Sequence, residues 1–117
     1  MSNAFEFERE AIAGKLSANG VANVTLDPRG QLPCVLVALP RVIGAQGIGG
    51  WECEFPIQII TPPPGDLDAA QWLLTQLEAV LTTFPVALAE PTTIVRNDTD
   101  VPCYVVTLAR SLISPNC

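Results

Sequence analysis

The run Trp51-Glu52-Cys53-Glu54-Phe55-Pro56-Ile57-Gln58-Ile59 decides the fold, because apolar side chains alternate along it with polar ones or proline. Successive residues of a strand face opposite sides of a sheet, so the alternation predicts a strand that is buried on one face only. Thr61-Pro62-Pro63-Pro64-Gly65 then ends the strand, since proline has no N–H to donate to a neighbour. The apolar face of this strand requires a covering layer.

The segment at 67–84 can supply that layer, because its apolar residues recur at helical spacing. Asp66 or Asp68 can cap the helix, and Pro85 closes it. The apolar stripe consists of Ala70, Leu73, Leu74, Leu77, Val80, Leu81 and Phe84. The side chains expected largely on the other side are Gln71, Thr75, Gln76 and Glu78. We expect this helix to pack on the strand that precedes it.

A second helix is predicted over 4–18 near the start of the chain. Asn3 and Glu6 resemble a capping box, and Gly20 is a plausible helix end. Phe5, Ile12 and Leu16 are compatible with one apolar side of this helix.

The remaining strands are expected at 21–26, at 32–39 with 41–43 as an extension, at 92–96 and at 103–111. The order is therefore helix, three strands, helix, two strands. This order predicts an α+β fold, α-β-β-β-α-β-β, with a mainly antiparallel sheet and two helices packed on one of its faces. A length of 117 residues fits one domain over 1–117.

The composition constrains the partners. Charged residues make up 15% of the chain, against about 25% in an average protein, so part of the surface is expected to lie against other subunits. The alternative is a monomer with a mostly polar, uncharged surface. A net charge of −6 disfavours nucleic-acid binding, because phosphates would be repelled.

The sequence also predicts a cytosolic site of synthesis. It has no apolar segment of membrane-spanning length and no secretory signal at its start. Cysteines in that compartment are reduced thiols. Cys34, Cys53 and Cys103 lie in apolar strand-like runs, where a thiol acts as a small hydrophobe, whereas Cys117 lies in the tail.

Residues suited to catalysis or to metal binding are scarce. The chain has no histidine, which removes the commonest general base, and its cysteines lack the paired short spacing of a zinc site. The glycine-rich stretch Gly44-Ala45-Gln46-Gly47-Ile48-Gly49-Gly50 is not followed by Lys-Ser/Thr and a helix, as a phosphate loop would be. We expect no catalytic residue, no metal site and no cofactor.

Three segments carry a resemblance to a known family. They are the Leu-Pro strand Gln31-Leu32-Pro33-Cys34-Val35, the strand at 51–60, and the helix Asp68-Ala69-Ala70-Gln71-Trp72-Leu73-Leu74-Thr75-Gln76-Leu77-Glu78-Ala79-Val80-Leu81. In these and in the order of its elements, the chain resembles the tail terminator and tail-completion proteins of long-tailed, siphovirus-like actinobacteriophages. The resemblance covers nearly the whole chain.

The resemblance implies a structural virion protein without enzymatic activity, in a single tail-terminator-like domain. Members of this family form a ring, a hexamer, at the head-proximal end of the tail tube. The ring ends tube polymerisation and joins the tail to the head connector. The implied partners are other copies of the chain, the tail tube protein and the connector protein, while genome DNA passes without specific binding. The protein would be made in the host cytoplasm and reside in the virion.

Candidate interface residues follow from this role as hypotheses. Glu52, Glu54 and Gln58, on the polar face of their strand, are candidates for a channel or inter-subunit surface. Trp72 is a candidate subunit anchor, although a place at the margin of the core explains it as well. The candidates for contacts with tube or connector lie in the glycine loop at 44–50 and in the connection at 85–91: Gly44, Gly47, Ile48, Gly49, Pro85 and Val86.

Two alternative functions remain open from the sequence. A head-closure or neck connector protein shares a small α+β design and ring symmetry. A small cytosolic ligand-binding domain, with its pocket between helix and sheet, belongs to a different class.

Overall fold

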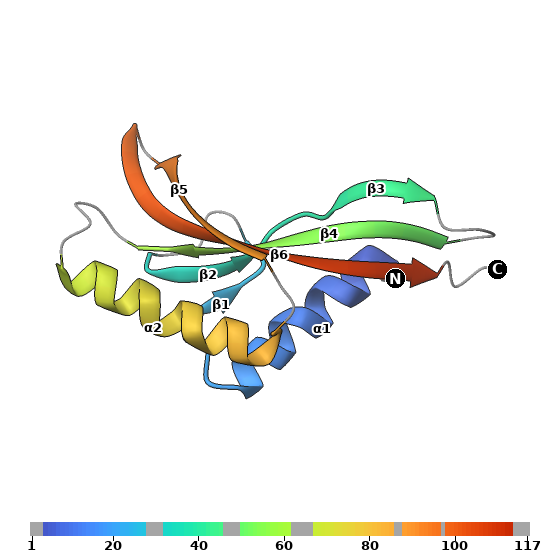
Figure 1. Cartoon of the computed structure of the whole chain (residues 1–117), viewed down its shortest axis with the longest axis horizontal. Helices are drawn as coiled ribbons and strands as arrows, with labels where there is room; N and C mark the ends of the chain where they lie inside the picture. The colour runs from blue at the N-terminus through green and yellow to red at the C-terminus, as the bar shows by residue number, and fades with distance from the viewer. Residues whose placement is uncertain are drawn as a thin grey trace.

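The computed structural model describes residues 4–27, 32–45, 50–61, 67–85, 88–96 and 98–113. Its elements, in chain order, are α1 (Ala4–Ala18), β1 (Val24–Thr25), β2 (Cys34–Val37), β3 (Arg41–Ala45), β4 (Gly50–Ile60), α2 (Leu67–Thr83), β5 (Leu88–Arg96) and β6 (Thr99–Ile113). Both helices lie on the same side of the sheet (Figure 1).

The six strands form one sheet in the order β1-β2-β4-β6-β5, and β3 pairs with β4 beside this path. The β1–β2 pair is parallel and the other pairs are antiparallel. The prediction of an α+β fold with a mainly antiparallel sheet is confirmed. The predicted element order is wrong in one respect, because four strands rather than three precede α2.

The additional strand arises where prolines interrupt a ladder. β2 and β3 both pair with β4, one after the other, so the predicted strand at 32–39 and its extension are two separate strands. Between them, the Ala38 N–H donates to the Pro56 carbonyl at 2.9 Å. Pro56 has no N–H to return, and Pro40 cannot donate either. The ladder therefore breaks at this point and resumes at Arg41.

Three other strands differ in their bounds from the sequence prediction, among them β6, which runs over Thr99–Ile113 rather than 103–111. β1 is limited to Val24–Thr25, because Asn23 adopts a left-handed φ of 54° and interrupts the extended chain before it. β5 begins at Leu88 rather than at Thr92, since the long strand β6 provides a partner as far as Thr107.

The core between helices and sheet follows the alternation in β4. Cys53, Phe55, Ile57 and Ile59 are buried on the helix side, as predicted. The α1 side chains Ile12 and Leu16 and the α2 side chains Leu73 and Val80 belong to the same cluster. Phe5 also takes part, with its ring centroid 5.1 Å from that of Trp51. The predicted apolar side of α1 is confirmed.

The helix α2 is rotated relative to the prediction. Gln76, expected to face solvent, is only 7% exposed, whereas Leu74 is 53% exposed. The Gln76 Oε1 accepts the backbone N–H of Ala22 at 2.9 Å, across 54 residues of sequence. A half-buried N–H without a partner is costly, so this hydrogen bond favours the observed rotation.

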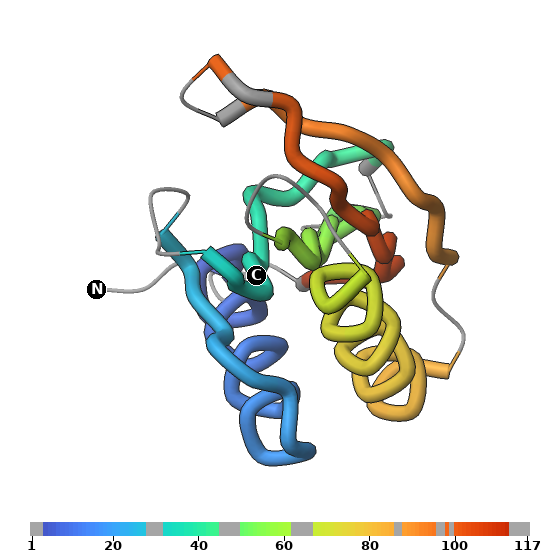
Figure 2. The backbone as a smooth tube through the Cα atoms, turned by 90° about the vertical axis from the view of Figure 1, so that its left-hand side faces the viewer, coloured from blue at the N-terminus to red at the C-terminus, as the bar shows by residue number. Residues whose placement is uncertain are grey.

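A second, smaller core lies on the opposite face of the sheet. Its buried residues are Cys34, Leu36, Ile60, Val101 and Cys103. Here the hairpin of β5 and β6 curves away from the helices (Figures 1 and 2) and covers the face at the end where β2 lies. The other end, formed by β3, β4 and the last part of β6, projects as an arm, and none of the described helices or strands packs over its helix-free face (Figure 1).

Replacing Gln76 tests the rotation of α2. Gln76→Ala leaves the Ala22 N–H without its acceptor, so the free energy of unfolding should fall by about 1–3 kcal/mol. Urea denaturation followed by circular dichroism measures the change. Gln71→Ala, at an exposed position of the same helix, is the matched control and should alter stability by no more than about 0.5 kcal/mol. Equal losses in both variants would contradict this role of Gln76.

Candidate functional site

The predicted polar residues of β4 lie together on the helix-free face. Glu52 is exposed, and Glu54 and Gln58 are half-buried. We call this surface the polar face: Arg41, Glu52, Glu54, Gln58, Thr107, Ala109 and Ser111. These residues share one side of the sheet because they pair directly across β3, β4 and β6, or alternate with the buried residues of β4 and β6.

Short side chains surround the two carboxylates of the polar face. Glu52 lies opposite Ser111, and Glu54 lies opposite Ala109. The one cation that pairs here within the described residues is Arg41, whose Nη1 lies 3.9 Å from the Glu54 Oε1 with 79% of its side chain exposed. Such a pair contributes about 0–1 kcal/mol. The face is therefore polar and acidic, with a weakly held arginine at its margin.

The other predicted interface residues are dispersed. Trp72 is half-buried and packs against the helix-side core. Gly44 belongs to β3, opposite Glu52, so the predicted loop at 44–50 is wrong at both ends: its first two residues are in β3 and its last is in β4. Pro85 is exposed directly after α2. Gly47, Ile48, Gly49 and Val86 lie outside the described residues.

The connection predicted at 85–91 is also partly wrong, since residues 88–91 belong to β5. β5 forms one lateral edge of the sheet and exposes large apolar side chains, with Leu88 at 63% and Val95 at 69%. β3 lies at the opposite edge and exposes Val42 and Ile43. Sequence reasoning missed these edges, because no local pattern shows which strand will be outermost.

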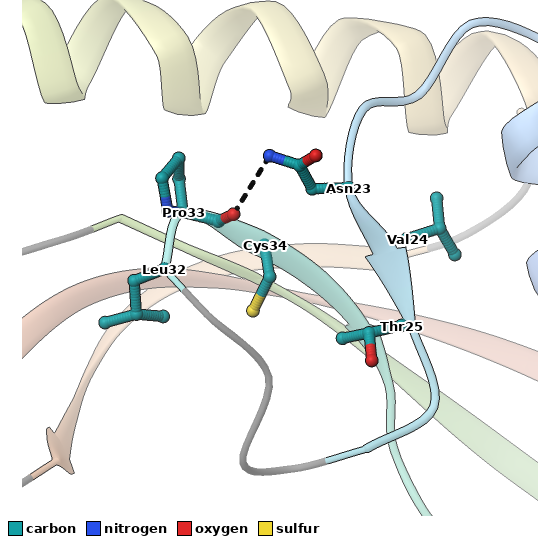
Figure 3. Close-up of a pocket in the computed structure, with 6 residues that line it drawn as sticks. All are labelled: Asn23, Val24, Thr25, Leu32, Pro33 and Cys34. Atoms are coloured by element: carbon teal, nitrogen blue, oxygen red, sulfur yellow. Dashed lines mark hydrogen bonds between the residues drawn. The ribbon is translucent and has the colours of Figure 1, made fainter.

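A surface pocket of about 350 Å³ lies where β1 meets β2 (Figure 3). Asn23, Val24, Thr25, Leu32, Pro33 and Cys34 line it. The Asn23 Nδ2 donates to the Pro33 carbonyl at 3.2 Å, which ties the two segments together. None of these six residues is charged.

A second hollow, of about 540 Å³, lies beside Arg9, Leu39 and Gln58. The Arg9 Nε donates to the Val37 carbonyl at 2.8 Å, and its Nη2 donates to the Leu26 carbonyl. The guanidinium therefore ties α1 to the backbone of the sheet. The first pocket lies at the margin of the sheet, whereas the second is lined by Arg9 of α1 and by residues of β2 and β4.

The buried thiols are held in their neutral form. Burial, and secondarily the neighbouring Cys34, raises the pKa of Cys103 from 9.0 to about 11. Burial also raises the pKa of Cys53. Cys34, Cys53 and Cys103 are all buried, so the prediction that they act as small hydrophobes agrees with their positions.

Within the described residues, no group of three or more His, Cys, Asp or Glu side chains is arranged to hold a metal ion. In the same part of the chain, no helix combines the length and the apolar character needed to cross a membrane. No known family model matches the chain, and no curated protein matches its sequence.

The raised pKa of Cys103 predicts a loss of stability at high pH. An unfolded thiol loses its proton near pH 9.0, but the folded one does so near about 11. The unfolded state therefore gives up the proton first, and the stabilisation present below pH 9 is lost as the pH rises towards 11. Urea midpoints at a series of pH values measure this loss. Cys103→Ala should flatten the dependence, and an unchanged slope would contradict the assignment.

Proposed function

We propose that this chain is a structural protein of a phage tail. It assembles as a ring, a hexamer, at the head-proximal end of the tail tube, ends tube polymerisation and joins the tail to the head connector. The observation that carries the proposal is the asymmetry of the sheet: both helices cover one face, and none of the described elements packs over Glu52 and Glu54 on the other. The resemblance described above supplies the role.

An uncovered acidic face suits the bore of such a ring. With the helices outside, Glu52 and Glu54 would line the channel and repel the phosphates of passing DNA. The side chains opposite them, such as those of Ala109 and Ser111, are short and would make few contacts with DNA. The net charge of −6 acts in the same direction. DNA would therefore slide through without being held.

Contacts with the tube and the connector are assigned to two connections between elements. Gly44, Gly47, Ile48 and Gly49 lie in or beside the connection between β3 and β4, and Pro85 and Val86 lie between α2 and β5. We assign these two connections to opposite partners in the tail, with synthesis in the host cytoplasm and the final place in the virion.

Disrupting the gene in its phage tests the role directly. Electron microscopy should show overlong tails without heads, because nothing stops tube growth. Tails of normal length beside finished heads would instead assign the chain to head closure. Normal infectious particles would contradict both virion roles and favour the small ligand-binding domain.

Reversing charge on the polar face tests the channel assignment. The double variant Glu52→Lys and Glu54→Lys should still yield complete particles, but with infectivity reduced by roughly tenfold or more, because lysines in the bore attract DNA phosphates. Plaque counts per particle measure the effect. Glu78→Lys, at an exposed position of α2, is the matched control and should leave infectivity unchanged. Equal infectivity of the two variants would contradict a channel at this face.

A further inference from the structure

The two open edges of the sheet carry an inference about assembly. Among the described strands, none pairs with the outer edge of β5 or of β3. An open edge presents unpaired N–H and C=O groups and is a template for another strand. The exposed apolar side chains Val42, Ile43 and Leu88 lie on these same two strands.

The direction of the free backbone groups follows from two hydrogen bonds. The Thr61 N–H donates across to Pro102 on the β6 side, whereas the Pro56 carbonyl accepts from Ala38 on the β2 side. Backbone groups in a strand alternate in direction, so odd residues of β4 point to β6 and even residues point to β2 and β3.

The alternation can be followed through the registers to each edge. Arg41 pairs with Glu54, an even residue of β4. The N–H and C=O of Arg41 therefore point inwards, towards β4, and those of Val42 point outwards, away from the sheet. In β5, Glu90 pairs with Val105 and points inwards, so Ala89 points outwards. Val42 and Ala89 therefore both offer a free N–H and a free C=O.

We propose that β3 of one copy pairs with β5 of the next copy as antiparallel strands, with Val42 opposite Ala89. This contact rests on the proposed function, since it is the joint between neighbouring subunits of the ring. In this register Arg41 lies opposite Glu90. Pro40 lies opposite Pro91, and the ladder ends there because neither residue has an N–H.

The faces of the two strands match in this register. Val42 pairs with Cys53 and Ala89 pairs with Val106, and both of these partners are buried on the helix side. Arg41 and Glu90 lie on the other side, with the polar face. The joined sheet therefore keeps all helices on one side and extends the polar face from copy to copy.

Charge selects this register over its neighbours. Glu90 is the charged residue among the described side chains of β5, and Arg41 is the charged residue of β3. A shift of two residues would place Val42 opposite Pro91, which has no N–H to donate. A shift of four would place Arg41 opposite Ile94 and leave Glu90 without an opposite charge across the joint.

The stagger between copies fits a closed ring. Within one copy, Arg41 lies opposite Glu54 of β4. Glu90 lies opposite Val105 of β6, which in turn lies opposite Gln58 of β4. The two residues are therefore offset by the four residues that separate Glu54 from Gln58. Four residues along a strand span about 13 Å, and the four strands β3, β4, β6 and β5 span about 19 Å. These lengths give a strand tilt of about 35°, close to the range of closed barrels. A head-to-tail contact of this kind forms a closed ring when the rotation from one copy to the next allows the last copy to meet the first.

Disulfide trapping tests the register. Arg41 and Glu90 would form a non-hydrogen-bonded pair with Cα atoms about 4.5 Å apart, within the range of a disulfide. Arg41→Cys with Glu90→Cys, in a Cys117→Ser background, should form a ladder of covalent oligomers on mild oxidation that ends at the ring size. Arg41→Cys with Thr92→Cys is the matched control, with the second thiol two residues out of register, and should stay uncrosslinked.

Charge exchange provides a second, independent test. Arg41→Glu or Glu90→Arg alone places like charges opposite each other and should weaken assembly by about tenfold or more. The double exchange should restore assembly, because opposite charges face each other again. Light scattering across a dilution series measures the change.

The outcomes separate this inference from the proposed function. Rings in electron micrographs without crosslinking of the Arg41→Cys and Glu90→Cys pair would overturn the edge contact and leave the ring intact. A chain that stays monomeric at high concentration would overturn both. Crosslinking in the out-of-register control as strongly as in the designed pair would also overturn the register.

Discussion

The antiparallel pairing of β4 with β6 is the constraint on which the rest of the structure depends. The register runs without a bulge from Gly50 opposite Ile113 to Ile60 opposite Cys103. Because the ladder is continuous, side chains keep the same face along both strands, and Phe55 and Ile57 stay on the helix side throughout. β2 and β3 pair along β4, β5 pairs along β6, and β1 pairs with β2. The register between β4 and β6 thus decides which of their side chains lie on each face of the sheet.

Prolines in this sheet lie where the ladder can lose an N–H. Pro56 lies within a central strand, where a missing N–H would normally break a ladder. It is tolerated because its carbonyl still accepts from Ala38 and because the gap between β2 and β3 falls beside it. Pro91 lies in an edge strand with its nitrogen directed outwards, so no ladder bond within the subunit is lost. The same positions limit where a neighbouring strand could pair.

The division of the sheet into two unlike faces relates the fold to the proposed role. Hydrophobic burial holds α1 and α2 on one face, through residues such as Leu16 and Val80. The curved β5–β6 hairpin buries a second cluster at one end of the other face. Glu52 and Glu54 remain on the part that neither helix nor hairpin covers. With the helices outside, a ring built from such subunits would have a helical exterior layer and an acidic interior.

Elements whose signals are local could be predicted from the sequence. The period of two at 51–59 set the strand, its buried face and the common side of Glu52, Glu54 and Gln58, and helical spacing with Gly20 set the extent of α1. The tertiary structure alone decided what depends on distant partners. Gln76 faces inwards because the Ala22 N–H is there to bind it, and β5 extends to Leu88 because β6 is long enough to pair with it. Which strands form the open edges is settled only by the assembled sheet, since hydrogen-bond partners far apart in sequence leave no periodic trace.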